Sequence, residues 1–300
     1  MATTYNGDHM KTHVRLCSLL CFLIGATSPL LAQTYIDTFD DGSRSDGNPS
    51  SWVTTTASNL TVVYDSGLNS YALSASGGNG LYYGTTLPTA FSLSTTSVLT
   101  LSLDFRLTGL QQFRIGLCNN AGSALPATDS ASLGTSAYQA IYLDIGADSY
   151  TAPTQIKYQV NGDGGLNGNL FFGTDRIFGS TLTTSGTLGT TVHNLKMTVQ
   201  LSSSTTALMN LYLDSVLVDT QTLSTTTLQS LIGANGVTSL MVLIPGQTGA
   251  SGDVLLDNIS ITVPEPSVAL LLVSSCVFLV LGRSRRFLLS KPSECTVSMS

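Results

Sequence analysis

The middle of this chain alternates apolar and polar residues with a period of two. The clearest segment runs from Leu99 to Leu107, where Leu or Phe occupies every odd position and polar residues occupy every even one. Residues 195–201 repeat the pattern with Leu, Met and Val at the odd positions. A strand with this period buries one face and leaves the other in water, as antiparallel sheets do. We therefore expect antiparallel β-structure here.

Other short apolar runs have the same character and are separated by Gly- and Ser-rich joints. They are Tyr35–Phe39, Leu60–Tyr64, Tyr71–Ala75, Phe113–Leu117, Tyr138–Ile145, Gln155–Val160, Leu208–Leu213, Val216–Gln221, Thr238–Leu243 and Val254–Val263. Only Leu223–Ile232 is typical of a helix, with Ser224 as a candidate N-cap. Many short strands with almost no helix predict one all-β domain over residues 33–263, an antiparallel β-sandwich of the jelly-roll kind.

Composition excludes one class of partner. Charged residues make up 10% of the 300 residues, far below the share typical of soluble proteins. Lys and Arg number only 12, against 18 acidic residues, and half of these cations lie in the terminal segments. This scarcity excludes a basic face for nucleic acid. Residues 33–263 also contain a single cysteine, Cys118, so we expect a lone buried thiol and no internal disulfide.

The N-terminus has the order of a secretory signal peptide. A basic segment, Met10–Arg15, precedes an apolar stretch, and Leu30-Leu31-Ala32 then places a small residue before a cleavage site. We expect the export machinery to recognise residues 1–32 and signal peptidase to cut between Ala32 and Gln33, with Met10 as the true start. A buried N-terminal helix is the alternative.

The C-terminal region carries three elements in order: a Pro-Glu-Pro motif, an uncharged apolar stretch and an arginine cluster. They are Pro264, Glu265 and Pro266, then residues 267–282, then Arg283, Arg285 and Arg286. As a helix the apolar stretch is about 24 Å long, slightly less than the roughly 30 Å hydrocarbon core. The arginines would stay on the cytoplasmic side. We therefore expect a single transmembrane helix at residues 267–282.

This layout resembles the PEP-CTERM sorting signal of Gram-negative bacteria, over residues 264–286. The resemblance implies that exosortase, a membrane protease–transpeptidase of bacteria that make exopolysaccharide, processes a membrane-anchored precursor. The product would reach the cell envelope, the outer surface or the extracellular matrix. The chain departs from the family by continuing into a tail, residues 287–300. A plain C-terminal membrane anchor is the alternative, because its hydropathy would look the same.

Two segments resemble parts of a known fold. Asn210–Asp219 predicts a tight hairpin turning at Asp214-Ser215, similar to a hairpin of concanavalin A-like and laminin-G-like jelly rolls. Ser215 stands where those hairpins have Gly, which makes a primed turn energetically less favourable because such turns need positive φ. The domain opens with Asp37–Gly42 and closes with Leu256–Ile261, as many exported carbohydrate-binding jelly rolls do. The resemblance implies that its first and last strands are neighbours.

Acidic residues near both ends of the domain form a candidate calcium site. If the terminal strands pair, they bring together Asp37, Asp40, Asp41, Asp257 and Asn258. Hard cations prefer such oxygen ligands, and calcium would tie together a sandwich that lacks disulfides. The alternative is a solvated turn at residues 40–42 and an ordinary strand edge at residues 257–258.

Catalytic signals are weak in this sequence. A jelly-roll glycoside hydrolase uses paired carboxylates, and the laminarinase-like family uses a Glu-x-Asp-x-x-Glu strand. The domain contains no Glu, because Glu265 and Glu294 are the only two in the chain. It lacks a Gly-x-Ser-x-Gly motif, and its one histidine, His193, cannot form a zinc site with one cysteine. We predict that the domain is not an enzyme.

Sugar binding would need exposed aromatic faces. The candidates for stacking on pyranose rings are Trp52, Tyr82 and Tyr83, with Tyr150 and Tyr158 as further choices. The best overall interpretation is an exported structural or adhesive protein of the envelope or exopolysaccharide matrix, with a glycan-binding β-sandwich. The alternative is a surface glycoside hydrolase or polysaccharide lyase of jelly-roll fold.

Overall fold

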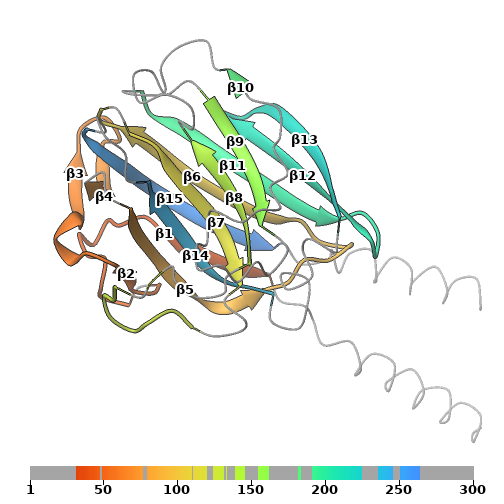
Figure 1. Ribbon diagram of the computed structural model, residues 1–300, viewed down its shortest axis with the longest axis horizontal. Helices are drawn as coiled ribbons and strands as arrows, with labels where there is room; N and C mark the ends of the chain where they lie inside the picture. Colours follow the sequence, from red (N-terminus) through yellow and green to blue (C-terminus); the bar gives the residue numbers. More distant parts are fainter. Residues whose placement is uncertain are drawn as a thin grey trace, which may run out of the picture. The chain divides into compact units, whose positions relative to one another are not determined.

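Two antiparallel sheets packed face to face make up the part of the chain that the structure describes (Figure 1). This computed structural model describes residues 32–47, 49–76, 80–109, 111–119, 124–131, 133, 139–145, 155–161, 182–183, 191–224, 236–245 and 251–263, with the backbone alone at 139, 155–161, 182–183 and 224. The strands are β1 (Gln33–Asp37), β2 (Trp52–Thr54), β3 (Leu60–Asp65), β4 (Ser70–Ser76), β5 (Leu81–Phe91), β6 (Leu99–Leu107), β7 (Phe113–Asn119), β8 (Gln139–Ile145), β9 (Gln155–Asn161), β10 (Leu182–Thr183), β11 (His193–Leu201), β12 (Thr206–Leu213), β13 (Val216–Ser224), β14 (Val237–Ile244) and β15 (Asp253–Val263). A short 3-10 helix, η1 (Ala57–Asn59), precedes β3.

The last two strands of the chain enter the middle of the two sheets. The eight-stranded sheet has the order β13-β12-β11-β6-β15-β4-β3, and β1 also pairs with β15. The seven-stranded sheet has the order β10-β9-β8-β7-β14-β5-β2. This arrangement is an antiparallel β-sandwich of the jelly-roll kind, which confirms the predicted fold. The first strand also lies beside the last, with Gln33 opposite Val263.

The alternating pattern of β6 produces the core between the sheets. Every odd residue from Leu99 to Leu107 is at most 1% exposed, and every even residue between them is partly exposed. Strand β6 lies between β11 and β15, so its apolar face is flanked on both sides by similar faces. The rings of Phe105 and Phe113 meet edge to face across the two sheets, with centroids 5.4 Å apart. This apolar burial is the main source of folding free energy.

The sequence pattern predicts that one face of each sheet is exposed to solvent. The seven-stranded sheet differs, because every residue of β7 is buried. The structure buries its outer face in a second apolar cluster to which Leu125 and Leu133 contribute, from the segment between β7 and β8. The sheet residues of this cluster are Val53, Cys118, Ala140, Tyr142, Met241 and Leu243. Cys118 is therefore a buried thiol, as predicted, and burial raises its pKa well above the ordinary value.

The predicted hairpin at Asp214-Ser215 joins β12 to β13. Both turn residues have positive φ, 50° and 67°, which is the signature of a primed two-residue turn. The Asp214 side chain stabilises this otherwise unfavourable turn conformation. Its carboxylate accepts a hydrogen bond from the backbone N–H of Asn194 at 2.9 Å and lies 2.8 Å from His193 Nδ1. His193 thus helps to hold this turn.

Three strands have no counterpart in the sequence pattern, and one helix prediction needs correction. The missed strands are β2 and β10, which are very short, and β5, which contains Gly84 and Pro88. Pairing between β5 and β14 is interrupted between Thr86 and Phe91, and Pro88 falls in that interruption, where its missing N–H costs nothing. The predicted helix would begin at Leu223, but that residue belongs to β13 and is buried in the core.

Other predictions fall outside the described residues. They are the signal peptide up to residue 31, the segment 264–300, the remainder of the predicted helix and Tyr150; of Tyr158 only the backbone is described. The cleavage prediction concerns Ala32, which is exposed, and Gln33, which begins β1. Within the described ranges, we find no helix with the length and apolar character needed to cross a membrane.

Gly84 offers a test of the second apolar layer. A Cβ at this position would lie 2.5 Å from Met241 Sδ and 2.6 Å from the carbonyl oxygen of Leu240. The backbone contact cannot be relieved by a rotamer change, so we expect Gly84→Ala to lower the free energy of unfolding by about 1–3 kcal/mol. Chemical denaturation measures this loss. The exposed strand variant Thr61→Ala is the control and should change the stability by about 0.5 kcal/mol or less.

Candidate functional site

A buried carboxylate positions the loop that carries the candidate site. Asp37, at the end of β1, accepts hydrogen bonds from Trp52 Nε1 at 2.8 Å, from the Phe39 backbone N–H at 3.2 Å and from the Tyr35 hydroxyl at 3.3 Å. Burial raises the pKa of Asp37, and the three donors oppose that shift by favouring the ionised form. The loop between β1 and β2 is therefore fixed at both ends.

This arrangement corrects two of the predicted stacking residues. Trp52 and Tyr83 are 1% and 0% exposed, and their ring centroids lie 6.1 Å apart in the core between the sheets. Phe39 completes the cluster, 6.0 Å from Trp52. The Trp52 ring turns inward because its indole N–H bonds to Asp37. Neither residue presents a face to a sugar ring.

The third candidate, Tyr82, lies on the outer face of the seven-stranded sheet and is half-buried. Burial raises the pKa of its hydroxyl, and the charge of nearby Arg114 partly offsets that shift. Arg114 pairs with the Asp144 carboxylate at 2.9 Å, and Gln112 donates to the same carboxylate at 2.8 Å. Stacking by Tyr82 stays a prediction.

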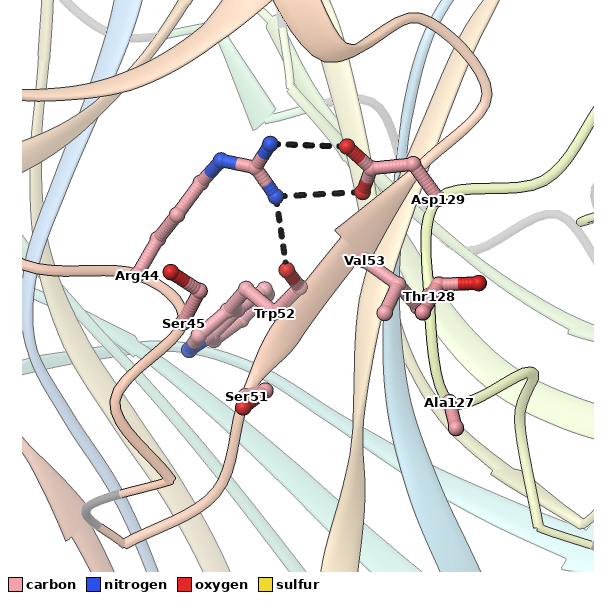
Figure 2. A pocket seen from close by; sticks show the side chains of 8 residues that line it. All are labelled: Arg44, Ser45, Ser51, Trp52, Val53, Ala127, Thr128 and Asp129. Carbon is pink, nitrogen blue, oxygen red and sulfur yellow. Dashed lines mark hydrogen bonds and ion pairs between the residues drawn. The ribbon is translucent and has the colours of Figure 1, made fainter.

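A pocket of about 370 Å³ opens beside the edge strand β2 (Figure 2). Its walls come from the loop before β2, from β2 itself and from residues 127–129, which lie across the strand. The lining residues are Arg44, Ser45, Ser51, Trp52, Val53, Ala127, Thr128 and Asp129. The volume lies in the range of small-ligand sites, and three hydroxyl side chains contribute to the lining.

The central polar feature of this pocket is a two-point ion pair. The Arg44 guanidinium donates to both carboxylate oxygens of Asp129, at 3.1 and 2.8 Å, and reaches it from the opposite wall (Figure 2). The same guanidinium donates to the Trp52 carbonyl oxygen at 2.8 Å. Hydrogen bonding from Arg44 is the main reason why the pKa of Asp129 is lowered, so the carboxylate stays ionised at neutral pH.

The ion pair also holds the edge of the sheet. Asp129 Oδ1 accepts from the Thr54 backbone N–H at 2.9 Å, and the Ser130 N–H donates to the Thr54 carbonyl oxygen at 3.0 Å. These bonds occupy backbone groups that an edge strand would otherwise expose. The pocket is thus built on a fixed frame.

The sequence did not point to Arg44 or Asp129. One signal was available: the region 33–263 has only six cations, and a scarce cation in a charge-poor domain is expected to have a specific partner. That argument marks Arg44 but not its partner, because Asp129 is 85 residues away in sequence. Only the packing of residues 127–130 against β2 brings the two together.

The residues proposed as calcium ligands are not brought to one place. Asp37 points into the core and bonds to Trp52, while Asp257 lies on the opposite face of the eight-stranded sheet and accepts from Ser70 Oγ. Asn258 donates its amide to Asp104 at 2.8 Å. Asp40 lies near Asp257 and Asp41 near Asp37, both in the exposed loop after β1.

This separation corrects the prediction of a five-residue calcium site. Alternate residues of a strand point to opposite faces, so strand pairing alone could not gather all five side chains. Burial is the largest cause of the raised pKa of Asp257, and the charges of Asp104 and Asp40 add to it. Among the residues that the structure describes, no group of three or more His, Cys, Asp or Glu side chains is placed to hold a metal ion.

Comparison with known proteins assigns this chain to no family. No protein-family model and no curated protein sequence matches the chain. Among solved structures, the carbohydrate esterase vb_24B_21 from the Shiga toxin-encoding bacteriophage phi24B is 17% identical, with a TM-score of 0.46, over 79% of this chain and 99% of its own. The metal-free carbohydrate recognition domain of Emp46p is 10% identical, with a TM-score of 0.48, over 76% and 95%.

The alginate lyase Aly36B is 11% identical, with a TM-score of 0.45, over 76% of this chain and 96% of its own. These similar structures include enzymes and a recognition domain. At such identities and TM-scores they transfer neither an activity nor a ligand to this chain.

The role of Asp37 can be tested by Asp37→Asn. An amide offers one acceptor oxygen where two carboxylate oxygens now meet three donors, so either Trp52 Nε1 or the Phe39 N–H would face an NH₂ group. We expect the free energy of unfolding to fall by about 1–3 kcal/mol. Trp52 is the only tryptophan of the chain, so its fluorescence follows unfolding directly. The exposed loop variant Asp41→Asn should stay within about 0.5 kcal/mol of the parent protein.

The Arg44–Asp129 pair should contribute to stability in a pH-dependent way. The folded-state pKa of Asp129 lies below its ordinary value of 3.8, so its contribution is present above that value and is lost as pH falls through the folded pKa. The free-energy difference between the parent protein and Asp129→Asn should be about 1 kcal/mol or less at neutral pH and should shrink below pH 3.8. A difference that stays constant down to pH 2 would contradict the assignment.

Proposed function

We propose that this domain binds a neutral polysaccharide without chemically altering it, and that the β2 pocket receives the sugar. The observation that carries the proposal is the Arg44–Asp129 pair set among hydroxyl groups. Sugar hydroxyls both donate and accept hydrogen bonds. A guanidinium supplies donors, a carboxylate supplies acceptors, and Ser45, Ser51 and Thr128 supply both.

The charge of the pocket favours a neutral sugar over a uronate. Arg44 is already neutralised by Asp129, and the whole chain has a net charge of −6. A polyanionic chain would therefore meet no excess positive charge here and would be repelled at longer range.

Catalysis at this pocket is disfavoured by its single carboxylate. Glycoside hydrolysis needs one carboxyl group that is protonated and a second that is ionised across the cleft. Among the described residues, Asp129 is the only acidic one that lines the pocket, and its lowered pKa makes it a poor proton donor. A hydrolase or lyase acting on surface glycans remains the rival function, and an activity assay on the same polysaccharides distinguishes it.

We further propose that the protein is exported and sorted, as an envelope or matrix component. The support is the order of sequence elements: a signal peptide ending at Ala32, the Pro264-Glu265-Pro266 motif, an apolar stretch and the arginine cluster. Signal peptidase and an exosortase-like protease would be its processing partners. In this setting a structural or adhesive role follows from holding exopolysaccharide.

The binding proposal is tested with immobilised neutral glucans, β-1,3-glucan and cellulose oligosaccharides, alongside alginate. We expect the parent protein to bind at least one neutral glycan, with little dependence on salt, and to bind alginate weakly or not at all. Asp129→Asn should weaken binding at least about tenfold, which corresponds to about 1.4 kcal/mol. This variant keeps an oxygen for the Thr54 N–H, so the edge of the sheet should survive.

The matched control is Asp253→Asn, which removes one carboxylate from β15, a strand of the other sheet. It should bind like the parent protein. Equal loss of affinity in both variants would show a general effect of charge, and binding of alginate alone would overturn the proposed specificity. Release of shorter products from any of the glycans would favour the rival enzyme.

A further inference from the structure

Two tyrosines on neighbouring strands expose their rings to solvent. Tyr64 on β3 and Tyr71 on β4 stand directly opposite each other in the sheet register. They are 57% and 41% exposed, although most aromatic residues whose side chains the structure describes are buried. The ring centroids lie 5.7 Å apart at an angle of 79°, so the pair forms a corner rather than a flat stack.

This corner is held by polar contacts around the β3–β4 turn. The Tyr64 hydroxyl donates to Asn69 Oδ1 at 3.0 Å. Asp65 accepts from the backbone N–H groups of Gly67 and Leu68, at 3.0 and 2.9 Å, and pairs with the Arg106 guanidinium. The Tyr64 ring is therefore oriented before any ligand arrives, which lowers the entropic cost of binding.

The tyrosine corner adjoins the loop that forms the pocket. A Cβ built on Gly42 would lie 4.0 Å from Tyr71 Cε1, so Gly42 lies beside the Tyr71 ring and leaves space next to it. Arg44 follows two residues later, a chain length of at most about 7 Å. The loop between β1 and β2 thus passes beside the tyrosine corner and forms one wall of the pocket.

We propose that Tyr64 and Tyr71 form a second sugar-binding subsite, so that the domain recognises a chain of several sugar residues rather than a single terminal sugar. This inference rests on the proposed function, because the same neutral glycan would occupy the pocket and the corner. A pyranose ring has an apolar face and a rim of hydroxyls. The tyrosine rings would stack against the apolar face of the sugar. The tyrosine hydroxyls and the Asn69 amide would form hydrogen bonds with the sugar hydroxyls.

The surroundings favour a sugar over a protein partner. At this corner the exposed apolar surface consists of two rings that both carry hydroxyls, and the β3–β4 turn beside it is polar. A stable protein interface needs a buried apolar centre and roughly 800 Å² on each partner. Two tyrosines are too small a centre for that, but they match one or two sugar rings.

The test compares the affinity of the protein for short and long oligosaccharides of the same glycan. Isothermal titration with cellobiose and cellohexaose, and with the corresponding β-1,3-glucan oligosaccharides, gives the gain in affinity on lengthening the ligand. We expect the parent protein to bind the hexasaccharide at least about tenfold more tightly. The double variant Tyr64→Ala/Tyr71→Ala should lose this gain and bind both lengths as the parent binds the disaccharide. Val63→Ala, also exposed on β3 but on the other face, is the control.

A second variant separates binding from folding. Tyr64→Leu/Tyr71→Leu keeps apolar bulk on both strands but has no ring, so it should retain the melting temperature and still lose the gain with length. If either double variant folds and keeps the full gain, or if the parent protein shows none, the subsite is refuted. The proposed function would then still stand, provided that Asp129→Asn weakens the binding of both lengths. If no glycan binds the parent protein, the proposed function itself fails, and the subsite fails with it.

Discussion

The hydrogen bond between the Asp37 carboxylate and the Trp52 indole is the interaction on which the described site depends. It links the end of β1, in one sheet, to the start of β2, in the other. A buried carboxylate is costly, and here three donors compensate for its lost hydration. Both ends of the intervening loop are thereby fixed, and this loop supplies Arg44 to the pocket and Gly42 to the tyrosine corner.

Scarcity of charge shapes the rest of the surface. The described cations of the domain each have a partner: Arg44 with Asp129, Arg106 with Asp65, Arg114 with Asp144, and Lys196 over the Tyr212 ring at 4.2 Å. Among the side chains that the structure describes, little positive charge is therefore left for attracting anions. The proposed recognition of a neutral sugar would accordingly depend on hydrogen-bond geometry and aromatic surface.

The sequence predicted the strands well wherever the hydrophobic period was regular. Strand β6 begins and ends at the predicted residues because nothing interrupts its alternation. Strand β5 was missed because Gly84 and Pro88 break the pattern, and each has a tertiary reason: Gly84 makes room for Met241, and Pro88 lies where pairing with β14 is interrupted. The stacking prediction failed at Trp52 and Tyr83 because residue type does not reveal exposure, and it overlooked Tyr64 and Tyr71 for the same reason.

The sequence by itself determined the all-β class, the antiparallel pairing, the tight turn at Asp214-Ser215 and the buried thiol of Cys118. These features depend on local patterns of polarity and on backbone preferences, which are written along the chain. Only the tertiary structure decided that Asp37 and Asp257 face opposite sides of a sheet, that Arg44 meets Asp129, and that Tyr64 and Tyr71 remain in solvent. Those outcomes depend on which distant segments pack together, and a single sequence carries no local signal for such packing.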